Sequence, residues 1–164
     1  MIRSIAALCA FLPSLALAQL NFPGGNVPGG TIWGVPGVSQ TVTLAGDVTI
    51  PSGTTLTVLP GTVITAAATD NIMRAGGTTR VDIFVEGSLV VQENAGETVT
   101  FTGPSTGTGT WGGLIASAGS TLTAGSASFQ RMASGIRVTA GAAGTTTVTL
   151  NNVSITNSVT GLSF

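Results

Sequence analysis

The sequence predicts an all-β chain that follows a cleaved signal peptide and folds as a short right-handed parallel β-helix, a β-solenoid. Three observations predict this fold class. Short segments alternate between apolar and polar residues, turn residues interrupt nearly all of these segments, and one segment near the C-terminus repeats at an offset of 26 residues.

The first eighteen residues have the features of a secretory signal peptide. Arg3 precedes an apolar segment over residues 5–12 that is too short to span a bilayer, and Ala16-Leu17-Ala18 forms a small-residue cleavage site. We expect cleavage after Ala18 and export to the medium or the cell surface. The predicted division is a signal peptide over 1–18, an N-terminal cap or lead-in segment over 19–41, and β-helix coils over 42–164.

Charge and cysteine content narrow the function classes. Charged residues make up 7% of the chain and hydrophobic residues 43%, a balance that argues against intrinsic disorder. The formal net charge is −1, so we expect no nucleic-acid partner, and no later apolar segment is long enough for a membrane span. The single cysteine, Cys9, lies in the predicted signal peptide, so we expect no disulfide in the mature chain.

Strands are predicted where apolar and polar residues alternate strictly, as in Val81-Asp82-Ile83-Phe84-Val85 and Val99-Thr100-Phe101. These segments are short and are bounded by Gly, Pro, Ser, Asn or Asp, so corners are frequent. The apolar positions of the alternation predict an inward-facing core of Val48, Ile50, Leu56, Val58, Ile83, Val85, Leu89, Val91, Val99, Phe101, Leu114, Leu122, Phe129, Ile136, Val138, Leu150, Val153, Ile155 and Leu162. Trp33 and Trp111 are predicted to pack on this core.

Internal repetition favours a solenoid over a β-sandwich. Residues 128–138 align without gaps on residues 154–164, and a weaker match sets residues 46–50 against residues 87–91 at an offset of 41. Coils of this kind must stack because one coil alone cannot bury its apolar face. A β-sandwich is the main alternative, but it predicts tight hairpin turns such as Asn-Gly or Asp-Gly, and the sequence contains neither dipeptide.

Four motifs carry a family resemblance. The segment from Gly46 to Ile64, followed by Gly87-Ser88-Leu89, by Phe101-Thr102 and by Trp111-Gly112-Gly113, resembles the opening coils of bacterial secreted proteins with right-handed parallel β-helix repeats. The resemblance covers about residues 42–164 and implies the fold. It implies little about activity, because such repeats occur in adhesins, surface proteins and carbohydrate-active enzymes.

Two segments depart from the repeat pattern. Residues 65–80 are longer than a corner requires and are predicted to loop out from the coil. Phe164 stands in mid-repeat with no polar cap after it, whereas solenoids cover their terminal coils. We therefore expect that the chain is a fragment of a longer protein or that a partner covers this end, and we expect end-to-end self-association at the C-terminal coil.

The mature sequence offers few groups for catalysis. His, Lys and Tyr are absent, and no cysteine follows Cys9, so the usual general bases, thiolates and imidazole metal ligands are missing. Asp82 and Glu86 lie four residues apart on one predicted strand, about 13 Å between Cα atoms, which is too far for one metal ion. Both are predicted to face solvent. We expect no catalytic residue, no metal and no cofactor within residues 19–164.

Threonine gives the clearest candidate binding pattern. Thr-x-Thr pairs recur along the predicted strands, and the later pairs follow one another at 23 and 26 residues, which approximates one coil. If the pairs align, their outward hydroxyl and methyl groups form a flat ladder. The alternative is that β-branched threonine simply suits strands that face water. The candidate binding residues are Thr55, Thr57, Thr98, Thr100, Thr121, Thr123, Thr147 and Thr149.

These observations leave three hypotheses for function. The first is a non-catalytic secreted or cell-surface β-helix, acting as a structural stalk or as an adhesin that binds extracellular polysaccharide or another cell-surface protein. The second is the N-terminal part of a carbohydrate-active β-helix enzyme whose catalytic coils lie beyond residue 164. The third is an ice-binding solenoid that uses the threonine ladder.

Overall fold

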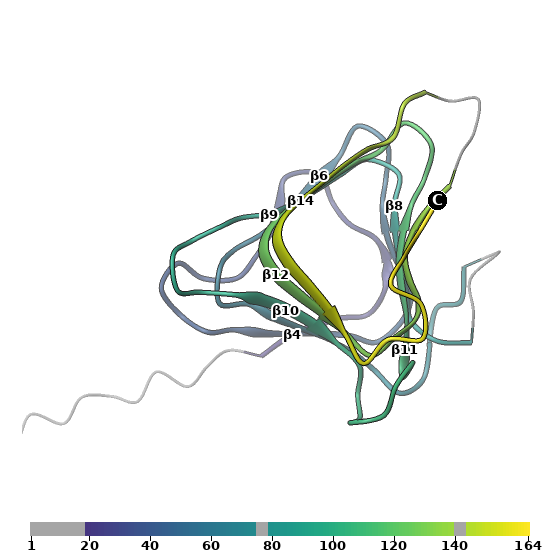
Figure 1. Cartoon of the computed structure of the whole chain (residues 1–164), viewed down its shortest axis with the longest axis horizontal. Helices are drawn as coiled ribbons and strands as arrows, with labels where there is room; N and C mark the ends of the chain where they lie inside the picture. The colour runs from purple at the N-terminus through teal and green to yellow at the C-terminus, as the bar shows by residue number, and fades with distance from the viewer. Residues whose placement is uncertain (1–18, 75–78, 140–143) are drawn as a thin grey trace, which may run out of the picture.

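The structure is a computed structural model that describes residues 19–74, 79–139 and 144–164, and all elements in these residues are β-strands. The strands stack in parallel to form a β-solenoid (Figure 1). The predicted signal peptide over 1–18 lies outside the described residues. In the described part of the chain, no helix is long and apolar enough to cross a bilayer.

The coils have three faces, each with its own column of parallel strands. Face one contains β3 (Thr31–Trp33), β6 (Thr55–Val58), β9 (Ser88–Val91) and the first halves of β12 (Thr121–Gln130) and β14 (Thr147–Thr156). Face two contains β1 (Leu20–Phe22), β4 (Thr41–Leu44), β7 (Val63–Ala66), β10 (Val99–Thr102) and the second halves of β12 and β14. Face three contains β2 (Gly25–Asn26), β5 (Val48–Ile50), β8 (Asp82–Val85), β11 (Trp111–Ala116), β13 (Met132–Val138) and β15 (Leu162–Ser163).

Faces one and two are continuous because β12 and β14 fold across the corner between them. In β12 the first half pairs with β9 and the second half with β10. The bend lies at Ser126, whose φ of 44° is left-handed, and Asn152 takes a φ of 52° at the same corner of the next coil. The Asn152 side-chain amide donates to Ser126 Oγ over 3.2 Å. In the earlier coils, longer segments make this corner and extend away from the core (Figure 1).

The predicted strand phase is confirmed through most of the molecule. All predicted core residues from Val48 to Ile136 are buried. The C-terminal end differs: Val138, Leu150, Val153 and Ile155 are only partly buried, and the prediction for Leu162 was wrong, since this side chain is 41% exposed. The reason is stacking. Among the described residues β14 pairs only with β12, β15 pairs only with β13, and the pairing of β13 with β15 stops at Arg137, before Val138.

Aromatic side chains fill the interior of the coil. The rings of Phe101 and Phe129, on neighbouring strands of face two, stack with their centroids 4.7 Å apart. Trp33 and Trp111 are buried, which confirms their predicted packing. The buried indole N–H of Trp111 donates to the Gln130 carbonyl oxygen over 2.6 Å, so the polar atom of the buried ring has a hydrogen-bond partner.

The two sequence repeats have different outcomes. The 26-residue offset is confirmed, because Ser128 pairs with Ser154 and Ile136 pairs with Leu162. The 41-residue offset was wrong. Val48 pairs with Ile83 on face three, whereas Leu89 lies on face one. Corners of different length separate successive strands, so two segments with similar sequences do not have to lie on the same face of the coil.

The coils begin earlier than the sequence predicts. Residues 20–33, assigned to a cap or lead-in segment, supply β1, β2 and β3, and these strands pair in parallel with β4, β5 and β6. Two- and three-residue strands among Gly and Pro give too little alternation to be seen in the sequence. The predicted excursion is confirmed for its described part, since β7 ends at Ala66 and β8 begins at Asp82.

Candidate functional site

The outward side chains of face one form two columns that run across the coils. One column aligns Thr57, Val90, Thr123 and Thr149, and the other aligns Thr55, Ser88, Thr121 and Thr147. None of these eight residues is buried. Adjacent members of a column lie about 4.8 Å apart, the spacing of paired strands. Over β6, β9, β12 and β14, face one is therefore an uncharged array of hydroxyl and methyl groups, with Val90 in its third coil. In β3, the exposed Ile32 pairs with Thr57 and extends the first column with an apolar side chain.

Thr98 and Thr100 do not belong to this array. Thr100 pairs with Val63 and Ser128 on face two, and Thr98 directly precedes β10 of the same face. The single ladder of the sequence prediction is therefore divided between two faces. Sequence spacing alone could not show this division. The chain segment between Thr100 and Thr121 contains β11 of face three and the two corners on either side of it.

Hydrogen bonding distinguishes the two faces. On face two, polar side chains bond to one another: Gln130 Nε2 donates to Ser128 Oγ over 3.0 Å, and Ser154 Oγ donates to the same oxygen over 3.1 Å. Arg131 Nη1 donates to Thr102 Oγ1 over 2.6 Å. Within the described residues, the face-one threonine hydroxyls make no such bonds. Face one therefore presents hydroxyls that can bond to a ligand without breaking bonds within the protein.

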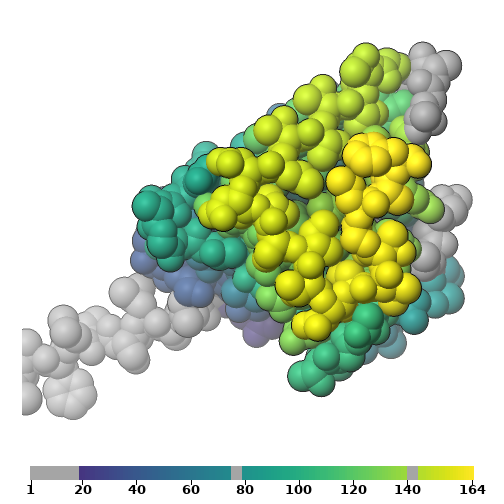
Figure 2. Space-filling view, viewed as in Figure 1, coloured from purple at the N-terminus to yellow at the C-terminus, as the bar shows by residue number. Residues whose placement is uncertain are grey.

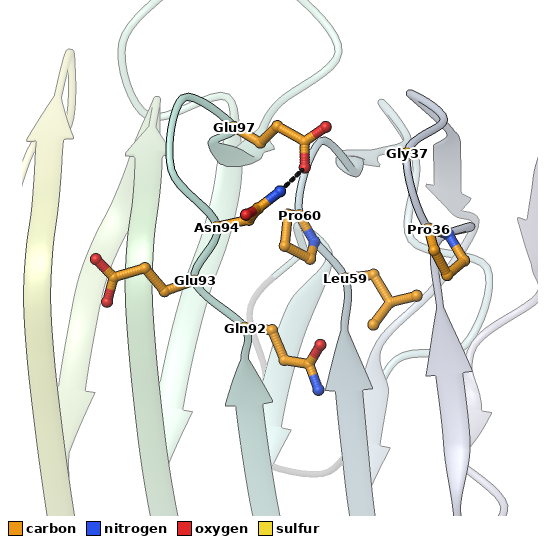
Figure 3. Close-up of a pocket in the computed structure, with 8 residues that line it drawn as sticks. All are labelled: Pro36, Gly37, Leu59, Pro60, Gln92, Glu93, Asn94 and Glu97. Atoms are coloured by element: carbon orange, nitrogen blue, oxygen red, sulfur yellow. Dashed lines mark hydrogen bonds between the residues drawn. The ribbon is translucent and has the colours of Figure 1, made fainter.

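A pocket lies at the corner between faces one and two, where three successive coils make longer loops (Figure 3). It has a volume of about 250 Å³. Pro36, Leu59 and Pro60 form its apolar part, and the segment that follows β9 supplies its polar part. We call this site the acidic corner; its polar residues are Gln92, Glu93, Asn94 and Glu97. The same segment projects beside β14 at the left of the molecule in Figure 2.

The buried carboxylates lie on the other side of the molecule. Asp82 was predicted to face solvent, and this was wrong, because Asp82 is fully buried beside Asp47. Asp47 Oδ1 accepts the Asp82 backbone N–H over 2.7 Å, and Asp47 Oδ2 accepts the Arg74 N–H over 2.8 Å. Glu86 is partly exposed and pairs with the Arg74 guanidinium, which lies 4.4 Å over the Phe84 ring. These groups attach the excursion after β7 to face three.

Burial raises the pKa of Asp47 above its ordinary value of 3.8. The loss of hydration is the largest cause, and the nearby carboxylates of Asp70 and Asp82 act in the same direction, against two backbone N–H donors that lower it. The folded protein therefore binds a proton at Asp47 more readily than the unfolded chain does. This difference makes folding more favourable as the pH falls through the raised pKa.

We expect the stability of the wild type relative to Asp47→Asn to increase between about pH 7 and about pH 4, because only the wild type takes up this proton. Thermal unfolding of both proteins across this range measures the difference. A difference that stays constant, or that decreases toward acid pH, would contradict the assignment.

Among the described residues, no group of three His, Cys, Asp or Glu side chains is arranged to hold a metal ion. Comparisons with protein family models, curated proteins and solved structures found no match. The candidate sites therefore rest on geometry. They are face one, whose residues the sequence identified in part, and the acidic corner, which it did not identify because the three loops that form it are far apart in the chain.

Proposed function

We propose that the mature chain is an exported, non-catalytic right-handed parallel β-helix that binds an extended polysaccharide along face one. The observation that carries the proposal is the double column of outward residues, seven of them Thr or Ser, whose hydroxyls make no hydrogen bond to the described residues. Export is supported by the signal-peptide pattern in the sequence of residues 1–18. Right-handedness is supported by the strong chiral preference of parallel crossover connections.

The chemistry of face one suits a neutral polymer. Hydroxyl groups can donate and accept hydrogen bonds with sugar hydroxyls, and threonine methyl groups offer apolar contact to the C–H faces of sugar rings. No outward side chain in either column is charged, so the face gives no electrostatic preference for an ionic ligand. A regular surface of this kind binds through many weak contacts spread over several coils, as extended solenoid surfaces do.

We expect the double variant Thr57→Tyr with Thr123→Tyr to weaken polysaccharide binding about tenfold or more, because two bulky rings interrupt the flat face between coils. The control is Thr100→Tyr, the same substitution on face two. A glycan array followed by titration calorimetry on the strongest hit measures both proteins against the wild type. Binding that survives in the face-one variant, or that is lost equally in the control, would remove face one from this role.

Ice is a second candidate ligand for the same surface. It is favoured by one specific feature, the Thr-x-Thr pair of β12 stacked in register on the Thr-x-Thr pair of β14. Thermal hysteresis of the wild type that disappears in the face-one variant would identify ice in place of polysaccharide. If neither ligand binds to face one, the structural-stalk hypothesis remains for the solenoid.

A further inference from the structure

We propose that the last coil, residues 144–164, pairs edge to edge with the last coil of a second copy, so that two chains form a closed, head-to-head dimer about a two-fold axis. The pairing surface is the open edge of β14, the edge that faces away from β12. It lies at the end of the stack that faces the viewer in Figure 2. Glycan binding on face one is not required for this pairing.

β14 presents unpaired backbone donors and acceptors on its open edge. The Thr147 N–H donates to the Ser120 carbonyl oxygen over 3.0 Å, so Thr147 points its backbone groups toward the preceding coil. The Thr156 carbonyl oxygen accepts the Arg131 N–H over 3.0 Å in the same direction. This direction alternates along a strand. The residues that point their N–H and C=O groups to the open edge, where no described strand pairs with them, are therefore Val148, Leu150, Val153 and Ile155.

The sequence of β14 reads alike in both directions by residue class. Counted outward from its central corner, each half carries an amide, an apolar residue, a hydroxyl residue, an apolar residue and a hydroxyl residue. The halves are Asn151, Leu150, Thr149, Val148 and Thr147, and Asn152, Val153, Ser154, Ile155 and Thr156. Exposure follows the same order, because the apolar members are half-buried against the core and the others are exposed. Such a strand is complementary to its own reversed copy, as a two-fold interface requires.

A two-fold axis through this corner stacks face one of each copy on face two of the other. Val148 then lies opposite Ile155 of the second copy, and Leu150 lies opposite Val153 of the second copy. All four residues point their backbone groups across the interface and their side chains toward the interior, so backbone pairing and core packing agree. These residues in the two copies form about eight backbone hydrogen bonds, and a typical stable interface has about ten.

The last coil lacks the features that protect an open edge. Soluble sheets block their edges with charged side chains or proline, and residues 144–164 contain neither. Two copies of this surface therefore meet without opposing like charges. Leu162, on the neighbouring edge strand β15, is exposed and adds apolar surface at the same end of the stack.

The first coil is a poorer match for the edge of β14. Its strands on faces one and two are β3 and β1, which have three residues each, and neither continues across the corner as β14 does. Head-to-tail stacking on the first coil therefore pairs fewer residues. It also leaves an open edge on every assembly and produces filaments, whereas head-to-head pairing closes after two copies.

Sedimentation equilibrium of the 19–164 chain at micromolar concentration is expected to give a dimer without larger species. Single cysteines test the register, because residues 19–164 contain no cysteine. In the dimer Thr149 lies opposite Ser154 of the second copy, about 4.5 Å between Cα atoms, which a disulfide can span. We expect an equal mixture of the Thr149→Cys and Ser154→Cys proteins to form a disulfide-linked dimer under mild oxidation, about tenfold more than either protein alone. The control mixture, Thr123→Cys with Ser128→Cys, places the cysteines one coil earlier and should not cross-link.

Charge variants test the same contact without cysteine. Thr149→Lys with Ser154→Lys opposes like charges in the dimer and is expected to raise its dissociation constant about tenfold or more. Thr149→Lys with Ser154→Glu opposes unlike charges and should keep dimerisation at the wild-type level or strengthen it. Both variants change the same two exposed residues, so each is the matched control for the other.

A monomer at micromolar concentration would overturn the proposal, and so would a series of species larger than the dimer, which head-to-tail stacking produces. Equal cross-linking by the mixture and by each single-cysteine protein alone, or equal dissociation constants for the two charge variants, would overturn it as well.

Discussion

Gly113→Ala is expected to lower the free energy of unfolding by about 3 kcal/mol or more. Gly113 has a φ of 143°, a conformation that is accessible only to glycine, and a Cβ added there would overlap the Gly135 carbonyl oxygen of the next coil. The obstructing atom belongs to the backbone of a buried strand, so it cannot move aside as a flexible side chain could. Denaturant unfolding followed by circular dichroism measures the loss.

The same column of residues contains the control for this variant. Gly113 pairs with Gly135, and Gly161 lies beside Gly135 in the last coil, where an added Cβ meets nothing within 4 Å. Gly161→Ala should therefore change the free energy of unfolding by less than about 0.5 kcal/mol, as an exposed substitution does. Equal losses for the two variants would mean that coil-to-coil contact at Gly113 is not the cause.

Phe129→Ala is expected to destabilise the protein by about 3–5 kcal/mol. The ring is fully buried and stacks on Phe101, so its removal loses the transfer free energy of the side chain and leaves a cavity between two coils. The cavity cannot close easily, because backbone pairing fixes the distance between neighbouring coils. The shift of the denaturant midpoint relative to the wild type gives the magnitude.

Ile155→Ala is the matched comparison for Phe129→Ala. Ile155 pairs with Phe129 in the same column but is only partly buried, so its truncation should cost distinctly less. A cost for Ile155→Ala as large as that for Phe129→Ala would show that the last coil is as well packed as the interior ones.

Local features of the sequence determined the parallel β-solenoid architecture, the strand phase and the register between β12 and β14. Alternation with period two assigned the inward side chains of buried strands from Val48 to Ile136, because successive residues of a strand point to opposite faces. The 26-residue repeat set β12 against β14 in the correct register, because the corners of those two coils have equal length. Both results depend on residues close together in the chain.

Tertiary structure alone decided which residues share a face and which loops share a corner. Thr100 lies on face two and Thr121 on face one. Asp82 is buried beside Asp47. The segment after β9, which contains Glu93, lines the same pocket as Pro36 and Pro60. The physical reason is that corner loops of unequal length lie between the strands. Hydrogen bonding between coils fixes the position of each strand. The alternation of apolar and polar residues within a strand does not reveal how long the loops on either side of it are.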